Sequence, residues 1–168
     1  MPIAIRKGTY QDTEAYIQLL QKVHGCMANR DWFYLDTPEE IRAMMKDDMM
    51  QLWVAMDRDK LAAAFTILIP GLSSVNYGYD LDFSEQELLR VVNMDTVAVL
   101  PEYRGQGLQY QLMQAAEREL VEQGRNILLC TVHPENRFSL QNILRQGYSI
   151  QKELPKYGSV RYFLRKDL

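Results

Sequence analysis

The strongest constraint on the fold is a loop with two glycines that joins an apolar strand to an amphipathic helix. Residues 91–100 alternate in the manner of a strand, and the loop 101–107 (Pro-Glu-Tyr-Arg-Gly-Gln-Gly) follows directly. From Leu108 onward apolar residues recur at helical spacing up to Gly124, which stands where a helix end is expected. Because such strand-loop-helix units build α/β proteins, we predict a sheet covered by helices on both faces.

The remaining patterns complete an α/β order with a mixed sheet. The sequence predicts further strands at 3–5, 52–56, 61–69, 127–132, 148–154 and 160–164, and helices at 13–23, 38–48, 84–87 and 136–145. Residues 71–82 have a loop composition and are interpreted as an insertion. Within 91–100, the alternation predicts Asp95, Val97 and Val99 on one face and Thr96, Ala98 and Leu100 on the other.

Composition narrows the class of protein. The chain has 168 residues, 47% hydrophobic and 24% charged, which predicts one domain over residues 1–168. The longest apolar run, 61–70, is about half the roughly 20 residues that cross a bilayer, and the amino terminus lacks the pattern of a secretion signal. The net charge of -3 and the lack of a long basic block disfavour nucleic acid as a partner. We therefore expect a cytoplasmic protein that binds neither membrane nor nucleic acid.

The two cysteines indicate neither a disulfide framework nor a metal site. Cys26 and Cys130 lack the paired spacing of zinc ligands, so no metal is expected. Because Cys130 lies in the apolar run 127–132, it is interpreted as a buried strand residue rather than a nucleophile.

The glycine loop has the chemistry of an anion site. Gly105 and Gly107 let several backbone N–H groups converge at a helix N-terminus, and Arg104 adds a charged donor. The alternative is a tight strand-to-helix turn that binds no ligand and needs glycine only for steric reasons. A Walker phosphate loop is excluded because the chain has no G-x-x-x-x-G-K-[ST], and G-x-G-x-x-G is not matched because position 110 is tyrosine.

Residues 97–108 (Val-Ala-Val-Leu-Pro-Glu-Tyr-Arg-Gly-Gln-Gly-Leu) resemble motif A of the GNAT superfamily of N-acetyltransferases. The family pattern is Arg or Gln, two residues, Gly, one residue, then Gly or Ala. Arg104 and Gly107 match this pattern, whereas Gln109 departs from it by placing a larger side chain beside the expected pyrophosphate. Residues 131–139 and the pair Gly147-Tyr148 similarly resemble motif B.

The resemblance covers nearly the whole chain and implies a GNAT-like fold. It implies a mostly antiparallel sheet of about seven strands that is splayed between strands four and five. Acetyl-CoA would lie in that gap as cosubstrate. The residues implied for it are Val97, Ala98 and Val99 by their backbone, the loop Arg104, Gly105, Gln106, Gly107, Leu108 and Gln109, and the polar Asn136 and Ser139.

The catalytic groups are less well defined by the sequence. Many relatives use a tyrosine four residues before the Gly of motif B to protonate the leaving thiolate, and here that position is Ile143. Replacement donors are Tyr148, Tyr157, Tyr103 or water, although Tyr148 also fits a core aromatic and Tyr157 a surface turn.

Asp95 is a candidate base because a carboxylate in an apolar strand has a raised pKa, and it also fits a structural carboxylate. His133 is a second candidate base, or a cap in the turn before Pro134.

The irregular segments suggest where an acceptor binds. Aromatic residues and an acid gather at Trp32, Tyr34, Tyr77, Tyr79 and Asp80, which suits an amine with an apolar body, although ordinary packing explains them equally. The sequence thus predicts direct transfer of an acetyl group from acetyl-CoA to a primary amine of a small molecule or peptide. Two alternatives remain, namely a CoA-binding sensor without turnover and a structural domain that holds another protein. The family resemblance also implies a homodimer.

Overall fold

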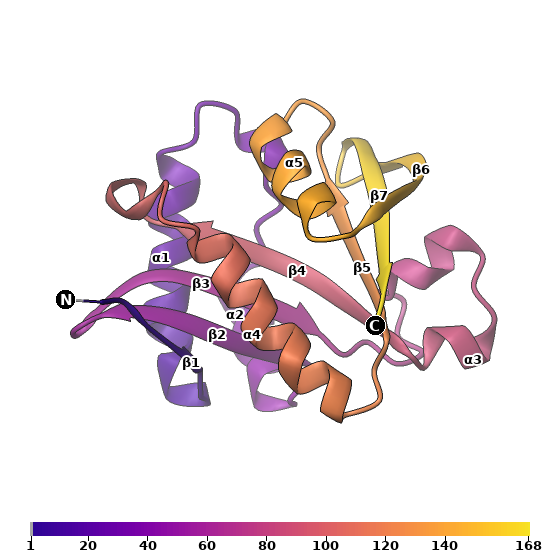
Figure 1. Cartoon of the computed structure of the whole chain (residues 1–168), viewed down its shortest axis with the longest axis horizontal. Helices are drawn as coiled ribbons and strands as arrows, with labels where there is room; N and C mark the ends of the chain where they lie inside the picture. Colours follow the sequence, from indigo (N-terminus) through magenta and orange to yellow (C-terminus); the bar gives the residue numbers. More distant parts are fainter. Residues whose placement is uncertain (1) are drawn as a thin grey trace.

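The computed structural model describes residues 2–168, and its framework is one seven-stranded sheet (Figure 1). The strand order is β1-β2-β3-β4-β5-β7-β6, and every neighbouring pair is antiparallel except β4 with β5. This is the mixed, mostly antiparallel sheet that the sequence predicted. The strands are β1 (Ala4–Lys7), β2 (Met50–Asp57), β3 (Lys60–Leu68), β4 (Val91–Val99), β5 (Ile127–Val132), β6 (Ser149–Lys156) and β7 (Ser159–Asp167).

Helices cover both faces of this sheet. In Figure 1, α4 (Leu108–Glu122) crosses in front of the sheet, with α1 (Thr13–Gly25) and α2 (Pro38–Lys46) behind it. The short α3 (Glu85–Leu88) follows a 3-10 helix, and α5 (Arg137–Arg145) lies beside β5 and β7. The start of α2 follows from local sequence, because Thr37 and Glu40 form a capping box and Pro38 takes the first helical position.

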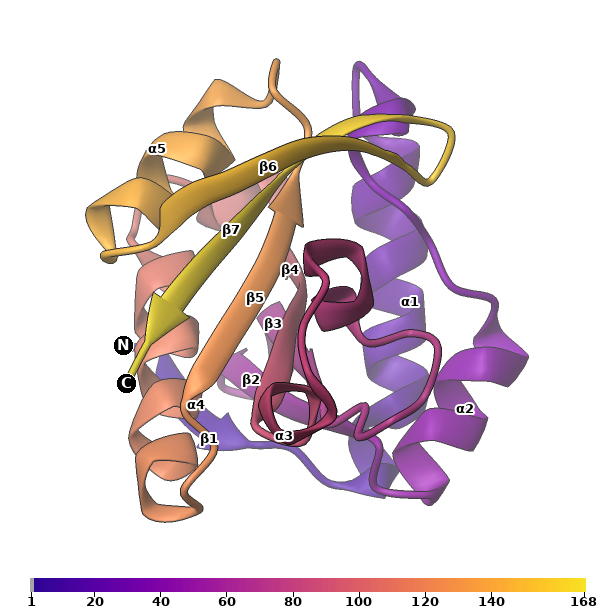
Figure 2. The same ribbon diagram turned by 90° about the vertical axis from the view of Figure 1, so that its right-hand side faces the viewer.

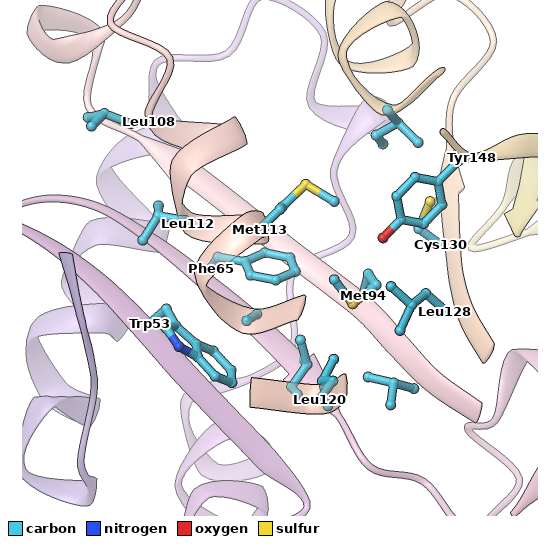
Figure 3. Packing of buried hydrophobic residues seen from close by; sticks show 14 of the residues in the cluster. Trp53, Phe65, Met94, Leu108, Leu112, Met113, Leu120, Leu128, Cys130 and Tyr148 are labelled. Carbon is cyan, nitrogen blue, oxygen red and sulfur yellow. The ribbon is translucent and has the colours of Figure 1, made fainter. Parts of the chain in front are cut away.

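Each face of the sheet has its own core. On the α4 face, Trp53 and Phe65 of the sheet pack with Leu112 and Leu120 of the helix, as Figure 3 shows. On the α1 face, Tyr16 belongs to a second cluster. Full burial of each large apolar side chain contributes about 1.5–3 kcal/mol. The period-2 pattern of β2 and β3 thereby fixes α1 and α4 on opposite sides.

A bulge in β4 changes the face to which its side chains point. Thr66 of β3 pairs with Thr96, but its neighbour Ile67 pairs with Met94, so Asp95 has no partner on β3. The extra residue breaks the alternation on which the sequence prediction for this strand relied.

The prediction that Asp95 shares a face with Val97 and Val99 is therefore wrong. The two valines pack against the α4 cluster. The Asp95 carboxylate instead lies on the α1 face near Thr66, whose hydroxyl is 3.2 Å from that of Tyr16. The bulge thus directs a carboxylate away from the apolar α4 side.

The two parallel strands separate soon after they meet. Only Val91, Val92 and Asn93 of β4 pair with β5, opposite Ile127, Leu128 and Leu129. Beyond Asn93 the strands diverge, so among residues 2–168 no strand pairs with the β5-facing edge of β4 from Met94 to Val99. This confirms the predicted splay and defines where a ligand can enter the sheet.

Several element boundaries differ from the sequence prediction. The first strand begins one residue later and ends two residues later than predicted. Both closing strands are longer than predicted because they form a hairpin with a two-residue turn. The insertion at 71–82 is not wholly loop, since Tyr77–Leu81 forms a 3-10 helix that Asn76 caps. Within residues 2–168, no helix combines the length and the hydropathy that a membrane span requires.

Candidate active site

A cavity of about 1130 Å³ occupies the gap where β4 and β5 diverge. Its walls come from α1 and the segment that follows it, from α2, β4, the glycine loop, the start of α4, α5 and the tip of the β6–β7 hairpin. Many predicted site residues line it, namely Trp32, Tyr34, Tyr77, Asp95, Val97, Val99, Arg104, Gly105, Gly107, Leu108, Gln109, Asn136, Ser139 and Tyr157. The cavity has two chemically different ends.

The glycine-loop end offers donors to an anion. Gly105 and Gly107 have φ values of 81° and 73°, in the left-handed region that favours glycine. Gly107 is the N-cap of α4, so no side chain caps this helix, whereas Asn136 caps α5 through the N–H of Ser139. In the described part of the chain, the first N–H groups of α4 therefore have no intrahelical or capping partner. Together with the helix dipole they favour a negatively charged ligand.

Arg104 adds a positive charge to this end. Its side chain is exposed at the cavity, and it forms no ion pair within residues 2–168. The first turn of α4 contains no acidic residue that would oppose an anion. Ala98 and Gln106 were predicted here as well, but they do not line the cavity, and Ala98 is buried in the α1 cluster.

Aromatic rings form the opposite end. The rings of Tyr34 and Tyr157 stack with centroids 4.2 Å apart, and the hydroxyls of Tyr157 and Tyr77 lie 2.8 Å apart. Burial raises the pKa of Tyr157 to about 12. Tyr157 has a φ of 54°, which costs a non-glycine residue roughly 1–2 kcal/mol. Its strained turn with Gly158 thus holds the ring over the cavity.

Arg161 links two of the segments that form the aromatic end. It is only 3% exposed, and its guanidinium donates to the carbonyls of Asp31 (2.5 Å), Trp32 (3.1 Å) and Lys156 (3.3 Å). It thereby joins the segment after α1 to the β6–β7 hairpin, which reaches across the molecule in Figure 2. Arg161 was not predicted as a site residue, because nothing in the neighbouring sequence distinguishes it from an exposed arginine on a strand.

Three carboxylate side chains line the cavity, those of Asp36, Glu40 and Asp95. Burial raises the pKa of Asp95 to about 7, and the charge of Asp36 adds to the shift. Burial and the charge of Glu40 likewise raise the pKa of Asp36 to about 6. Neither aspartate forms an ion pair within residues 2–168. Asp36 was not predicted, since it precedes the capping box of α2 and reads as part of a helix start.

Four other predicted residues lie outside the cavity lining. Tyr148 is in the α4 core and donates a hydrogen bond to Glu117 (3.3 Å; Figure 3 shows the ring among apolar side chains). His133 stacks on Trp32 at 6.1 Å, and its Nδ1 accepts the N–H of Glu135, which is the capping alternative. Tyr79 donates to the carbonyl of Leu72, and Asp80 pairs with Lys156 at 3.1 Å.

A sequence model described as the acetyltransferase (GNAT) family matches residues 14–148. The chain belongs to the GNAT acetyltransferase family. The matched range runs from the start of α1 to the residue before β6, and therefore includes the glycine loop and both strands that bound the cavity.

Solved structures show the same GNAT fold. An acetyltransferase of the GNAT family from Streptococcus pneumoniae has a TM-score of 0.75 and 18% identity, with 99% of each chain covered. The structure of yncA from Salmonella typhimurium with its cofactor acetyl-CoA has a TM-score of 0.74 and 15% identity, covering 99% of this chain and 94% of that one. The paia N-acetyltransferase from Thermoplasma acidophilum, in complex with coenzyme A, has a TM-score of 0.66 and 13% identity over 100% of both chains. At these identities the likeness concerns the fold alone. Comparison with curated proteins gives no match.

Three further observations concern the catalytic groups of this GNAT chain. Ile143, the position at which the motif B resemblance implied a tyrosine, is buried in the α4 core. Within residues 2–168, no three His, Cys, Asp or Glu side chains are grouped as metal ligands. Cys130 is buried, and burial raises the pKa of its thiol.

Proposed function

We propose that this GNAT protein transfers an acetyl group from acetyl-CoA directly to a primary amine of a small molecule or a peptide. The observation that supports this most is the continuity of the cavity. One space joins the donor-rich glycine-loop end to an aromatic end with three carboxylates. A cosubstrate held at the first end therefore has its thioester directed toward an amine at the second.

The cosubstrate would be held by groups that the fold leaves without partners. The N–H groups at the start of α4 and the side chain of Arg104 would bind the pyrophosphate. The free edge of β4 around Val97 and Val99 would pair with the amide groups of the pantetheine arm. Bound there, acetyl-CoA supplies an acetyl group activated as a thioester.

The acceptor end suits an amine that arrives as a cation. Asp36 and Asp95 place carboxylates in the cavity. The rings beside them already attract cations of the chain itself, since Lys156 lies 5.7 Å from the ring centroid of Tyr77 and Arg161 lies 5.7 Å from that of Tyr157. The nearby cations are already engaged, since Arg161 binds backbone carbonyls and Lys156 pairs with Asp80. We therefore propose a positively charged amine, such as a diamine or a basic amino-terminal segment.

Asp95 is the proposed general base. A pKa of about 7 lets it accept a proton from the ammonium group, directly or through water, near neutral pH. The neutral nitrogen then attacks the acetyl carbonyl, the C–N bond forms, and the C–S bond breaks. The nitrogen loses its second proton as the amide forms, and this proton passes through water or the hydroxyl of Tyr157 to the departing thiolate, because Ile143 has no proton to give.

The test is acetyl transfer from acetyl-CoA to a panel of amines, measured as free thiol released and as acetylated product by mass spectrometry. The panel contains diamines, basic and acidic dipeptides, and an uncharged hydroxylamine ether as the control for charge. We expect turnover with the diamines or basic peptides and little with the acidic ones. Preference for acidic or uncharged amines would contradict the assignment of the acceptor end.

The buried Ile143 favours one second candidate, a CoA-binding sensor without turnover. Such a protein would bind acetyl-CoA with micromolar or better affinity and leave the whole panel unacetylated over the pH range 6–9. Binding together with transfer to any member of the panel would exclude this candidate.

A further inference from the structure

The cavity has an apolar wall that the proposed function does not use. This wall is formed by Val23, Met27, Phe33, Met44, Leu68 and Val75. Val23 and Leu68 belong to the buried cluster on the α1 face of the sheet, and Phe33 and Met44 pack against that cluster while staying partly exposed. The hydrophobic core on the α1 face therefore reaches the surface of the cavity.

The spacing of residues along α2 places this wall next to a carboxylate. Glu40, Ala43 and Met44 are three and four residues apart, so they share one face of the helix, and all three line the cavity. Glu40 and Met44 thus stand one helical turn apart, about 6 Å along the axis. The neighbouring α1, which lies beside α2 in Figure 2, contributes Val23 from its last turn.

The insertion between β3 and β4 brings the wall close to the proposed base. Leu68 pairs with Asn93, which lies two residues before Asp95 on β4. The Nδ2 of Asn93 donates to the carbonyl of Val75 at 2.8 Å, and this hydrogen bond holds the insertion against β4. The side chain of Val75 is 41% exposed and lines the cavity. The wall therefore adjoins the carboxylates of both α2 and β4.

The two parts of this surface favour two different groups of one ligand. Apolar side chains that face a cavity favour an apolar group, which displaces the water beside them. An ammonium group has the opposite preference, since it keeps its charge only beside water or a carboxylate. A ligand that satisfies both parts carries its charge and its apolar group a few bonds apart.

We propose that the acceptor is an amphipathic amine. Its alkyl or aryl group packs on the apolar wall, and its ammonium group lies among Asp36, Glu40 and Asp95. The inference rests on the proposed function and narrows its acceptor from any cationic amine to one with an apolar body. Because methionine side chains adapt their shape, Met27 and Met44 let the wall accept more than one apolar group.

The test measures kcat/KM for acetyl transfer to amines that share one ammonium group, with free thiol as the readout. The amines are n-propylamine, n-hexylamine, and aminohexanol, which adds a terminal hydroxyl to the hexyl chain. Met44→Gln and Val75→Thr each keep the size of the side chain and make one position of the wall polar. Met49→Gln and Val121→Thr are the matched controls, because neither residue lines the cavity. The melting temperature of each variant is measured alongside.

The apolar wall predicts a preference for the longer alkyl chain. Each methylene that leaves water strengthens binding roughly fourfold, so three partly buried methylenes raise kcat/KM at least about tenfold in the parent. Aminohexanol stays within about threefold of propylamine, because its hydroxyl cannot leave water for an apolar surface without loss. Each wall variant lowers the hexylamine value about three- to fivefold and leaves propylamine within about twofold. Both control variants keep the preference of the parent.

Three results would overturn the proposal while leaving the proposed function intact. The first is equal kcat/KM for all three amines in the parent. The second is a hexylamine preference that survives both wall substitutions, and the third is an equal loss for every amine in them. If Met44→Gln does not fold, Val75→Thr decides, since it changes an exposed residue without changing its shape. A parent that acetylates neither these amines nor the earlier panel would overturn the proposed function, and this inference with it.

Discussion

The two ends of the cavity are built in different ways. The glycine-loop end comes from one continuous stretch, in which β4, the loop and the start of α4 follow one another along the chain. The aromatic end is assembled from the segment after α1, the start of α2, the bulge in β4 and the tip of the β6–β7 hairpin. The first end offers open N–H groups and Arg104, and the second offers carboxylates and rings.

The glycine-loop end depends on local backbone conformation, whereas the aromatic end depends on contacts between segments that are distant in the sequence. The donors at the glycine loop follow from backbone conformation, so a single substitution there is expected to change the proposed cosubstrate binding with little effect elsewhere. The aromatic end depends on contacts such as those of Arg161, which bridge segments 130 residues apart in the chain, as with Asp31. A change at this end is therefore expected to alter acceptor use, rate or stability while leaving cosubstrate affinity intact.

Among changes confined to the aromatic end, Asp95→Asn is expected to have the largest effect on the rate of acetyl transfer. Removing the proposed base lowers kcat about 100-fold, within the range typical of general base catalysis. In the parent, kcat/KM rises as the pH passes about 7, because Asp95 then loses its proton. The variant loses that inflection. Stopped assays over pH 5–9 measure both effects, and an unchanged profile in the variant would exclude Asp95 as the base.

Asp95→Asn, which is expected to lower kcat, is also expected to raise the stability of the folded protein above neutral pH. The pKa of Asp95 is about 7 in the folded chain against an ordinary value of 3.8, so between these values the folded state holds the extra proton. Stability therefore falls as the pH rises from about 4 to 7. At pH 8 the Asn variant gains on the order of 2 kcal/mol in unfolding free energy. Urea unfolding at pH 4 and pH 8 measures this difference, which is absent if Asp95 is well solvated.

Arg161→Lys tests whether the aromatic end is held together by three hydrogen bonds or by charge. Lysine keeps the charge but cannot donate to all three carbonyls at once. We expect the KM for the acceptor to rise roughly tenfold, since one or two hydrogen bonds are lost. The Kd for acetyl-CoA should stay within about twofold. An equal loss at both ends would show that the two ends are not separable.

The smallest effect is expected from Tyr148→Phe. The hydroxyl contacts Glu117 in the core and not the cavity, so its removal leaves kcat and both KM values within about twofold. The unfolding free energy should fall by about 1 kcal/mol, the net value of a typical hydrogen bond. A kcat that falls tenfold or more would return Tyr148 to the set of candidate proton donors.

Features set by local sequence could be predicted from the sequence, whereas features that depend on contacts between distant segments could not. Gly105, Gly107 and the helix after them form a contiguous pattern whose conformation is set locally, and they were predicted together. The bulge at Asp95 was not predicted, because strand alternation gives no sign of which residue is left out of the pairing. Asp36 and Arg161 were missed because their roles depend on segments that meet only in the folded chain.

The most direct test of the central claim is a calorimetric titration with acetyl-CoA of the parent, Gly107→Asp and Gly124→Asp. Both glycines have a positive φ at an end of α4, and a new Cβ meets no close atom at either one. The strain is therefore matched, while only Gly107 lies at the cavity. We predict that the parent and Gly124→Asp bind acetyl-CoA and that folded Gly107→Asp does not. Equal binding by both variants would contradict the assignment of the glycine loop as the cosubstrate site.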